Sequence, residues 1–301
     1  IEPSELTTVN GTQEGMAHIF FTICNPGDTV LIPDPGYPIF RDGIEMAGGE
    51  AVTYPLTEQN CFLPDFSQIP EAVRKKAKAI VASYPLNPAG VTAPDWFYEE
   101  LIAFAKEHQM FVIYDNAYSD IIFGDRKGTS FLSFKGAKEV GIEFFSLSKS
   151  YNVTGARISF AVGNEEMITQ FKRFRSRIDY GMFLPLQYGA IAALTGDQTA
   201  VGEQCKRYEE RARRLSGGLR QLGWPVNDSQ GSMFVWAKIP GGYEECECFC
   251  SELLEKTGVI CTPGTSFGRL GCQYVRFALV IDPDEIEEAL QAIKESGILG
   301  S

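Results

Sequence analysis

Histidine and cysteine are scarce in this chain of 301 residues, which has only two histidines, His18 and His108, and eight cysteines. Because these residues supply most zinc and transition-metal ligands, little is available for a metal site, and we expect none. Cysteines this sparse do not make a disulfide scaffold in a chain of such length. We therefore expect the thiols to be reduced.

Long apolar runs and an excess of positive charge are missing as well. No segment approaches the roughly 18 consecutive apolar residues of a membrane span, and residues 1–11 lack the charged and apolar regions of a signal peptide. The 27 lysines and arginines stand against 39 aspartates and glutamates, a net charge of −12. Because an acidic surface repels phosphate backbones and anionic membranes, we expect neither nucleic acid nor a membrane as partner. These features predict a cytoplasmic protein.

The one cluster of cysteines is Cys246, Cys248 and Cys250, in ECECFC. Spacings of two at the start of a predicted helix point the three side chains in different directions, unlike the C-x-x-C spacing of metal and redox sites. Metal binding or redox chemistry stays an alternative, but the pattern favours small residues at the boundary of the core.

Short apolar runs alternate with amphipathic stretches between residues 17 and 163. Uninterrupted apolar strands separated by helical periods indicate a parallel or mostly parallel sheet, sandwiched by helices on both faces. The predicted fold is therefore α/β. The predicted helices are 17–24 and 95–109, and the predicted strands are 29–33, 79–85, 111–115, 143–148 and 158–163.

The pattern changes near residue 199 to a long charged amphipathic helix, predicted over 203–224 and ended by Gly223 and Pro225. The order that follows predicts a smaller α+β C-terminal domain. We divide the chain into a large domain, residues 1–198, and a small domain, residues 199–301. The small domain's predicted strands are 231–239 and 273–280, and its further helices are 246–258 and 282–297.

Polar side chains gather where predicted parallel strands end, which is the edge at which open α/β sheets bind ligands. Asp115 ends one strand, and Asn87 and Lys149 follow two others. A carboxylate at the end of an apolar strand needs a cation or a donor, so Asp115 requires a buried partner. With Asn87 and Tyr118, it could bind a flat heteroaromatic ring that carries both a protonated nitrogen and an oxyanion.

Lys149 stands among hydroxyl residues in SLSKSYNVTGAR, residues 146–157. A desolvated lysine near cations loses its proton and can then condense with a carbonyl group, which is Schiff-base chemistry. Ser146 and Ser148 flank the lysine, and Arg157 lies eight residues beyond it. Because a guanidinium and hydroxyls together clamp a dianion, this stretch predicts a phosphate on the ligand.

Two further stretches fit the same ligand but have plainer alternatives. Gly11, Thr12 and Gln13 form a glycine turn before a helix, and such a turn offers backbone N–H groups to an anion. Thr12 could instead only cap the helix. Tyr37 in PDPGYPIF could lay its ring on a flat cofactor or only pack within its own turn.

The ordered motifs PGYP, YPLNPAG, YDNAYSD, SLSKSYNVTGAR and YVRFALV resemble those of the class I/II aminotransferases, the fold type I enzymes dependent on pyridoxal phosphate (PLP). The resemblance runs from Gly11 to the last predicted helix. It implies the fold type I large domain, with its mostly parallel sheet between helices, followed by the smaller domain.

The resemblance implies roles for the residues at the strand ends. Lys149 matches the lysine that attaches PLP covalently and moves the proton between substrate and cofactor. Asp115 matches the carboxylate that keeps the pyridine nitrogen protonated, so that the ring withdraws electrons. Asn87 and Tyr118 match the pair that hydrogen-bonds the ring oxygen, and Tyr37 matches the aromatic residue stacked on the ring.

The phosphate group is expected at Ser146, Arg157 and the turn of Gly11, Thr12 and Gln13, with Ser148 as a further member. Ser159, close to Arg157, departs from the family pattern, which usually has glycine there.

Arg276 in YVRFALV falls where the family places the arginine that binds the substrate α-carboxylate, and Asn87 is expected in the same substrate site. The resemblance thus implies a transaminase that moves an amino group between an amino acid and a 2-oxo acid. EFFSLSKSYN and DYGMFLPLQ resemble the branch of alanine–glutamate transaminases and LL-diaminopimelate aminotransferases, without separating the two.

Members of the family have active sites at a dimer interface and an N-terminal arm in the substrate pocket, so a homodimer is expected. This chain begins at Ile1, and the arm is expected to be absent from it. Two alternatives stay open. One is a PLP-dependent C–S β-lyase, and the other is the aminotransferase-like domain of a transcription regulator.

Overall fold

A computed structural model describes residues 1–299 of the chain. The strands are β1 (Leu6–Val9), β2 (Thr29–Asp34), β3 (Glu50–Pro55), β4 (Ala77–Ser83), β5 (Phe111–Asn116), β6 (Gly141–Ser146), β7 (Ser159–Gly163), β8 (Phe234–Lys238), β9 (Thr262–Pro263) and β10 (Tyr274–Ala278). The helices are α1 (Thr12–Ile23), α2 (Ile39–Met46), α3 (Glu71–Lys76), α4 (Asp95–Glu107), α5 (Ala137–Val140), α6 (Leu147–Ser150), α7 (Glu165–Arg175), α8 (Leu184–Thr195), α9 (Thr199–Gln221), α10 (Cys246–Thr257) and α11 (Pro283–Ser296).

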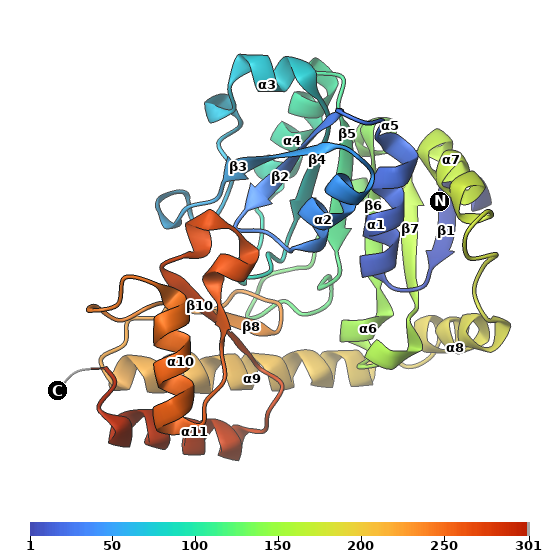
Figure 1. Ribbon diagram of the computed structural model, residues 1–301. Helices are drawn as coiled ribbons and strands as arrows, with labels where there is room; N and C mark the ends of the chain where they lie inside the picture. Colours follow the sequence, from blue (N-terminus) through green and yellow to red (C-terminus); the bar gives the residue numbers. More distant parts are fainter. Residues whose placement is uncertain (300–301) are drawn as a thin grey trace.

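The first seven strands form one sheet in the order β1-β7-β6-β5-β4-β2-β3 (Figure 1). Strands β2 to β6 pair in parallel, whereas β7 is antiparallel to both β6 and β1. The predicted mostly parallel α/β sheet is therefore confirmed. β1 and β3 have no counterpart among the predicted strands, because short, partly exposed edge strands lack a long apolar run.

Consecutive residues of the central strands pack on opposite faces of this sheet. In β4, Ala79 and Val81 join the core formed with α1, α2 and α7, whereas Ile80 and Ala82 pack on the side of α4. β5 alternates in the same way. Helices thus exclude water from both faces, which explains why the strands are continuously apolar.

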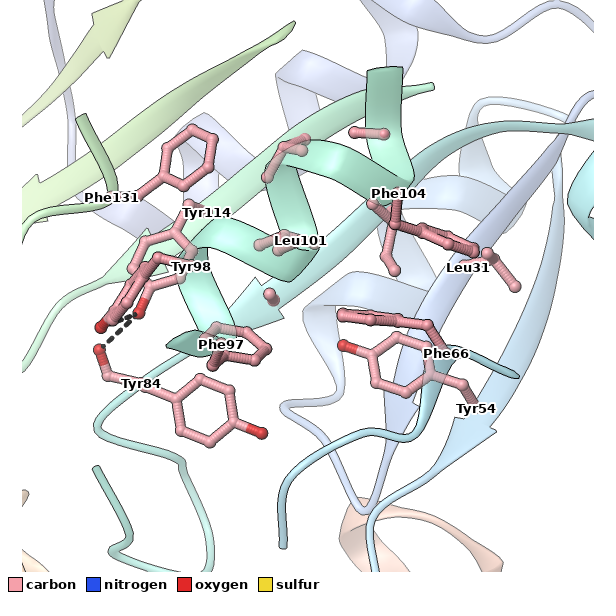
Figure 2. Close-up of a cluster of buried hydrophobic side chains, with 14 of the residues drawn as sticks. Leu31, Tyr54, Phe66, Tyr84, Phe97, Tyr98, Leu101, Phe104, Tyr114 and Phe131 are labelled. Atoms are coloured by element: carbon pink, nitrogen blue, oxygen red, sulfur yellow. Dashed lines mark hydrogen bonds between the residues drawn. The ribbon is translucent and has the colours of Figure 1, made fainter. Parts of the chain in front are cut away.

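Aromatic rings dominate the core between the sheet and α4 (Figure 2). The hydroxyl groups of Tyr98 and Tyr114 share a hydrogen bond of 3.0 Å, and Tyr114 Oη also donates to the carbonyl of Tyr84 at 3.1 Å. These bonds satisfy buried phenols that would otherwise destabilise the core. Because Tyr84 opens the turn that contains Asn87, the same bonds fix the chain where β4 ends.

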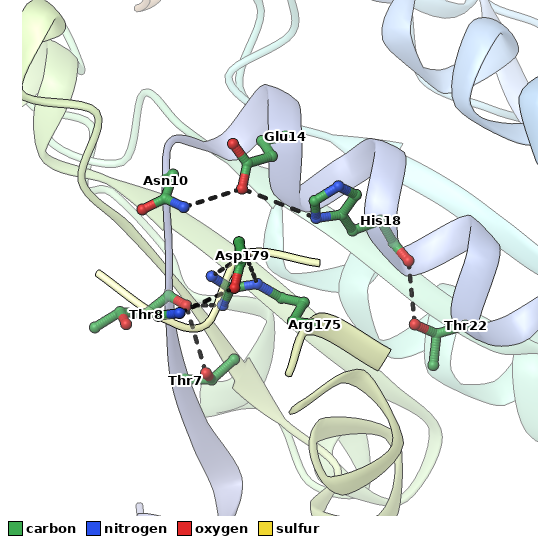
Figure 3. A network of polar contacts seen from close by, with 9 residues as sticks. Thr7, Thr8, Asn10, Glu14, His18, Thr22, Arg175 and Asp179 are labelled. Carbon is green, nitrogen blue, oxygen red and sulfur yellow. Dashed lines mark hydrogen bonds and ion pairs between the residues drawn. The ribbon is translucent and has the colours of Figure 1, made fainter. Parts of the chain in front are cut away.

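Two groups of polar contacts lie beside the turn that precedes α1, one joining β1 to α7 and the other joining the turn to α1 (Figure 3). Arg175 is buried, and its Nε donates to Asp179 Oδ2 at 2.7 Å, while its Nη1 donates to the carbonyl of Thr8. On the other side of the turn, Asn10 Nδ2 donates to Glu14 Oε1 at 3.1 Å. The turn that starts α1 is therefore held from both of its ends.

The remaining strands form an antiparallel sheet in the order β8-β10-β9, with α9, α10 and α11 packed around it. In Figure 1, α9 runs along the base of the molecule from α6 to this sheet. The change of architecture follows the predicted order of elements, except that β9 was not predicted. The division between residues 198 and 199 stays a prediction. Among the helices of residues 1–299, none combines the length and apolar character needed to cross a membrane.

Candidate active site

A cavity at the carboxyl ends of the parallel strands collects most of the predicted site residues. It is lined by Thr12, Gln13, Met16, Tyr37, Ile39, Asn87, Asp115, Ala117, Tyr118, Ser146, Ser148, Lys149, Thr154 and Arg157. Two predicted residues, Gly11 and Arg276, are not in this lining. Both contact residues that are, since Gly11 lies against Arg157 and Arg276 bonds to Asn87.

Asp115 lies near the end of β5 and is buried without a charged partner among residues 1–299. Within residues 1–299, the only hydrogen bond that its side-chain carboxyl group accepts comes from the backbone N–H of Ala117, at 3.2 Å. Burial raises the pKa of its carboxyl to about 7, and the Ala117 hydrogen bond only partly offsets this. A cavity-lining carboxyl in this state would bind a ligand that brings its own N–H⁺ group.

Lys149 lies in α6, directly after β6. This short helix begins where the predicted strand 143–148 was expected to continue, because Ser146 Oγ caps it by accepting the N–H of Ser148 at 3.2 Å. Burial lowers the pKa of the Lys149 ammonium group, and the charges of Arg157 and Arg276 lower it further. Both effects shift the protonation equilibrium of Lys149 toward the neutral amine, which is the nucleophilic form.

Gly11 and Arg157 fit closely at one end of the cavity. A Cβ on Gly11 would fall 1.9 Å from Arg157 Nη2, and the φ of +94° at Gly11 is one that other residues rarely adopt. Arg157 Nη1 in turn donates to the carbonyl of Thr154 at 3.0 Å. Only glycine at this position lets the guanidinium lie over the N-terminus of α1. The guanidinium and the helix N-terminus each favour an anion at this place.

A chain of hydroxyl groups closes the same end. Thr12 Oγ1 donates to Ser159 Oγ at 3.1 Å, and Ser159 Oγ donates to Ser146 Oγ at 3.1 Å. The sequence marked Ser159 only as a departure from the family pattern. Its position gives it a function in linking α1 to the end of β6.

Tyr37, Asn87 and Tyr118 also line the cavity. Tyr37 Oη donates to Gln13 Oε1 at 3.3 Å, which ties the Tyr37 turn to α1. Burial raises the pKa of the Tyr118 phenol, so that it stays a hydrogen-bond donor. Its ring contacts Phe234 edge-on, with centroids 5.8 Å apart.

Arg276 reaches this region from β10 of the small sheet. Its Nη1 donates to Asn87 Oδ1 at 2.9 Å, and its guanidinium carbon lies 4.0 Å and 4.6 Å from the ring centroids of Phe234 and Phe267. Both rings therefore hold the cation by cation–π contact. Phe234 and Phe267 were not among the predicted site residues, since each looks like an ordinary core residue in the sequence.

The fold is that of an α/β protein in which a lysine amine and a buried carboxyl line one cavity, next to a glycine turn at a helix N-terminus. The family model for aminotransferase class I and II matches residues 1–293, and the chain belongs to this family. The chain is thus an aminotransferase, an enzyme of small amino and keto acids. The family and the fold are generally PLP-dependent.

Known relatives agree with this assignment. The chain is 44% identical over 294 residues to an LL-diaminopimelate aminotransferase of Halothermothrix orenii, covering 98% of this chain and 75% of that protein. The substrate-bound structure of BacF from Bacillus subtilis matches with a TM-score of 0.95 and 39% identity, covering 99% and 76% of the two chains. An aminotransferase from Staphylococcus aureus also matches with a TM-score of 0.95, at 35% identity over 99% and 79%.

These comparisons confirm the fold type I architecture and the transaminase function predicted from the sequence. They give no support to the alternatives of a C–S β-lyase or a regulator domain. The chain spans about three quarters of the length of the relatives, as the shares of 75% and 76% indicate.

The raised pKa of Asp115 predicts how the stability of the ligand-free chain depends on pH. An unfolded aspartate has a pKa near 3.9, whereas the folded value is about 7. Between these values the folded state binds more protons, so the free energy of unfolding falls as pH rises, by up to roughly 4 kcal/mol. Asp115→Asn should lack this loss, as measured by urea unfolding from about pH 4 to about pH 8.

Asp125→Asn serves as the matched control, because Asp125 is exposed and its variant should follow the wild-type curve. If wild type and Asp115→Asn change in parallel across this range, the buried state of Asp115 is wrong.

Proposed function

We propose that this aminotransferase uses PLP bound in the cavity and that its amino donor is LL-diaminopimelate, with a 2-oxo acid as acceptor. The observation that carries the PLP proposal is the buried Asp115, which has no cationic partner among the described residues and lines the same cavity as Lys149. The donor is proposed from the relatives of this chain. Three of them, at 44%, 43% and 42% identity, are LL-diaminopimelate aminotransferases.

The residues present fit the parts of PLP. Asp115 would hold the ring nitrogen in its protonated form, and Asn87 and Tyr118 would bond the ring oxygen. Tyr37 would stack on the ring, and Lys149 would form the covalent bond to the carbonyl carbon of PLP. The phosphate would lie at the hydroxyl and guanidinium end of the cavity, held by Gly11, Thr12, Gln13, Ser146, Ser148 and Arg157.

When bound, PLP supplies a ring that withdraws electrons from the substrate α-carbon. The chain's own residues supply the rest. Lys149 Nζ takes the α-proton and returns it, a task for which its lowered pKa suits it. Arg276 binds the α-carboxylate through its guanidinium, and its contact with Asn87 places the amino acid beside the cavity.

We propose further that the enzyme is a cytoplasmic homodimer, with the two-domain division predicted above. Helix α8 and the segment before it expose apolar side chains that a second copy would cover: Ile178, Tyr180, Phe183, Leu184, Tyr188, Ile191 and Leu194. The eight free cysteines and the net negative charge of the chain support the proposed cytoplasmic location. Sedimentation velocity tests the dimer, since a concentration-independent monomer would contradict it.

The donor proposal predicts a substrate profile. The PLP-loaded enzyme should convert LL-diaminopimelate with 2-oxoglutarate at a higher kcat/KM than alanine or aspartate with the same acceptor. Glutamate formation by mass spectrometry measures this. A preference for alanine would replace the proposed donor with the alanine–glutamate type while leaving the aminotransferase assignment in place.

The proposed covalent role of Lys149 predicts a chemical modification. Borohydride reduction of the PLP-loaded wild type should fix the cofactor to the peptide that contains Lys149. Lys149→Ala should lose both this adduct and turnover, whereas Lys135→Ala, outside the cavity, should keep both. An adduct found on another lysine would show that the anchor is assigned to the wrong residue.

Arg276 predicts a loss of substrate binding. Arg276→Ala should lower kcat/KM for the amino acid by the equivalent of about 2 to 5 kcal/mol, mostly through KM, because the substrate carboxylate loses its partner. Arg276→Lys should recover only part of this, since lysine lacks the planar fork. Lys238→Ala, an exposed position of the same sheet, is the control. An unchanged KM in Arg276→Ala would exclude the carboxylate role.

A further inference from the structure

A pair of thiols lies in the small domain, outside the active-site cavity. The Sγ atoms of Cys250, in α10, and Cys261, directly before β9, are 3.4 Å apart. The three cysteines of the α10 cluster do point in different directions, since Cys246 is buried, Cys248 exposed and Cys250 half-buried. No spacing in the sequence predicts that Cys250 lies beside Cys261.

The geometry of the pair suits a reversible disulfide. A disulfide bond is about 2.05 Å long, so the two sulfurs, now 3.4 Å apart, must approach by about 1.4 Å when it forms. Both residues keep part of their surface exposed, so a small reagent can reach them. The two thiols share a hydrogen bond in which either sulfur can be the donor. This contact lowers the pKa of the Cys250 thiol, whereas the same contact and burial raise the pKa of Cys261. Cys250 is therefore the nucleophile of the pair.

The pair is also connected to the proposed substrate site. Thr262 follows Cys261 in the chain and lies opposite Arg276 in the β9–β10 pairing. Thr262 Oγ1 accepts a hydrogen bond from Arg276 Nη2 at 3.5 Å. A bond between Cys261 and α10 would draw the start of β9 toward that helix, and Thr262 would move with it.

We propose that Cys250 and Cys261 form a redox site that closes to a disulfide by exchange with small disulfides and thereby weakens substrate binding at Arg276. The second part rests on the proposed function of Arg276. The Cys250 thiolate attacks one sulfur of the small disulfide, forms a mixed disulfide and releases one thiolate. Cys261 then gives up its proton and attacks the Cys250 sulfur, releasing the second thiolate. The two cysteines lose two electrons and two protons, which the two released thiols carry.

The first test is chemical and independent of activity. The PLP-loaded enzyme is equilibrated in glutathione buffers of increasing oxidised fraction, quenched in acid and alkylated. Peptide mass mapping should find Cys250 joined to Cys261 after the loss of two hydrogen atoms. Cys250→Ser and Cys261→Ser should abolish the linked peptide, while Cys248→Ser, an exposed position on the same helix, should keep it. Glutathione adducts alone, or both thiols still free, would overturn the redox site.

The second test measures the connection to Arg276. Oxidised wild type should show a KM for the amino acid raised by about two- to tenfold, the range for one lost hydrogen bond, with a smaller change in kcat. Dithiothreitol should restore the reduced value, and Cys250→Ser should keep the reduced KM in every buffer. A linked peptide with an unchanged KM would overturn the proposed effect of the disulfide on substrate binding at Arg276. Failure of Arg276→Ala to raise KM would instead count against the proposed function.

Discussion

A carboxylate buried at the end of a parallel strand is the constraint on which this site depends. Asp115 cannot be both charged and stable in its position unless something in the cavity supplies a positive charge, because the described chain supplies none within bonding distance. Water cannot solvate this carboxylate from either face of the sheet, because helices cover both faces. A cationic ring bound in the cavity would supply this positive charge, which is why the proposed cofactor site is centred on Asp115.

The parallel sheet explains why so few contacts are needed to assemble that site. Neighbouring strands end at the same edge, so residues from β2, β4, β5 and β6 and the N-terminus of α1 converge without a dedicated loop domain. Local packing then sets the details. Gly11 makes space for Arg157, and the hydroxyls of Thr12, Ser159 and Ser146 link the three elements that carry them, α1, β7 and β6.

Much of this could be predicted from the sequence, because apolar strands and strand-end residues are local signals. Asp115, Lys149 and Arg157 stand in motifs that indicate their chemistry. Phe234 and Phe267 could not be found in this way, since an aromatic residue that holds an arginine looks like any other core residue. The pairing of Cys250 with Cys261 also depends on how α10 packs on β9, which no spacing in the sequence encodes.

The bond between Arg276 and Asn87 ties the small sheet to the turn that lines the cavity. In the proposed function the Asn87 amide would serve both the substrate carboxylate and the cofactor ring, so that changing one of these contacts would disturb the other. Attempts to give this scaffold a new donor should therefore conserve that pair and vary the surroundings of the substrate's far end.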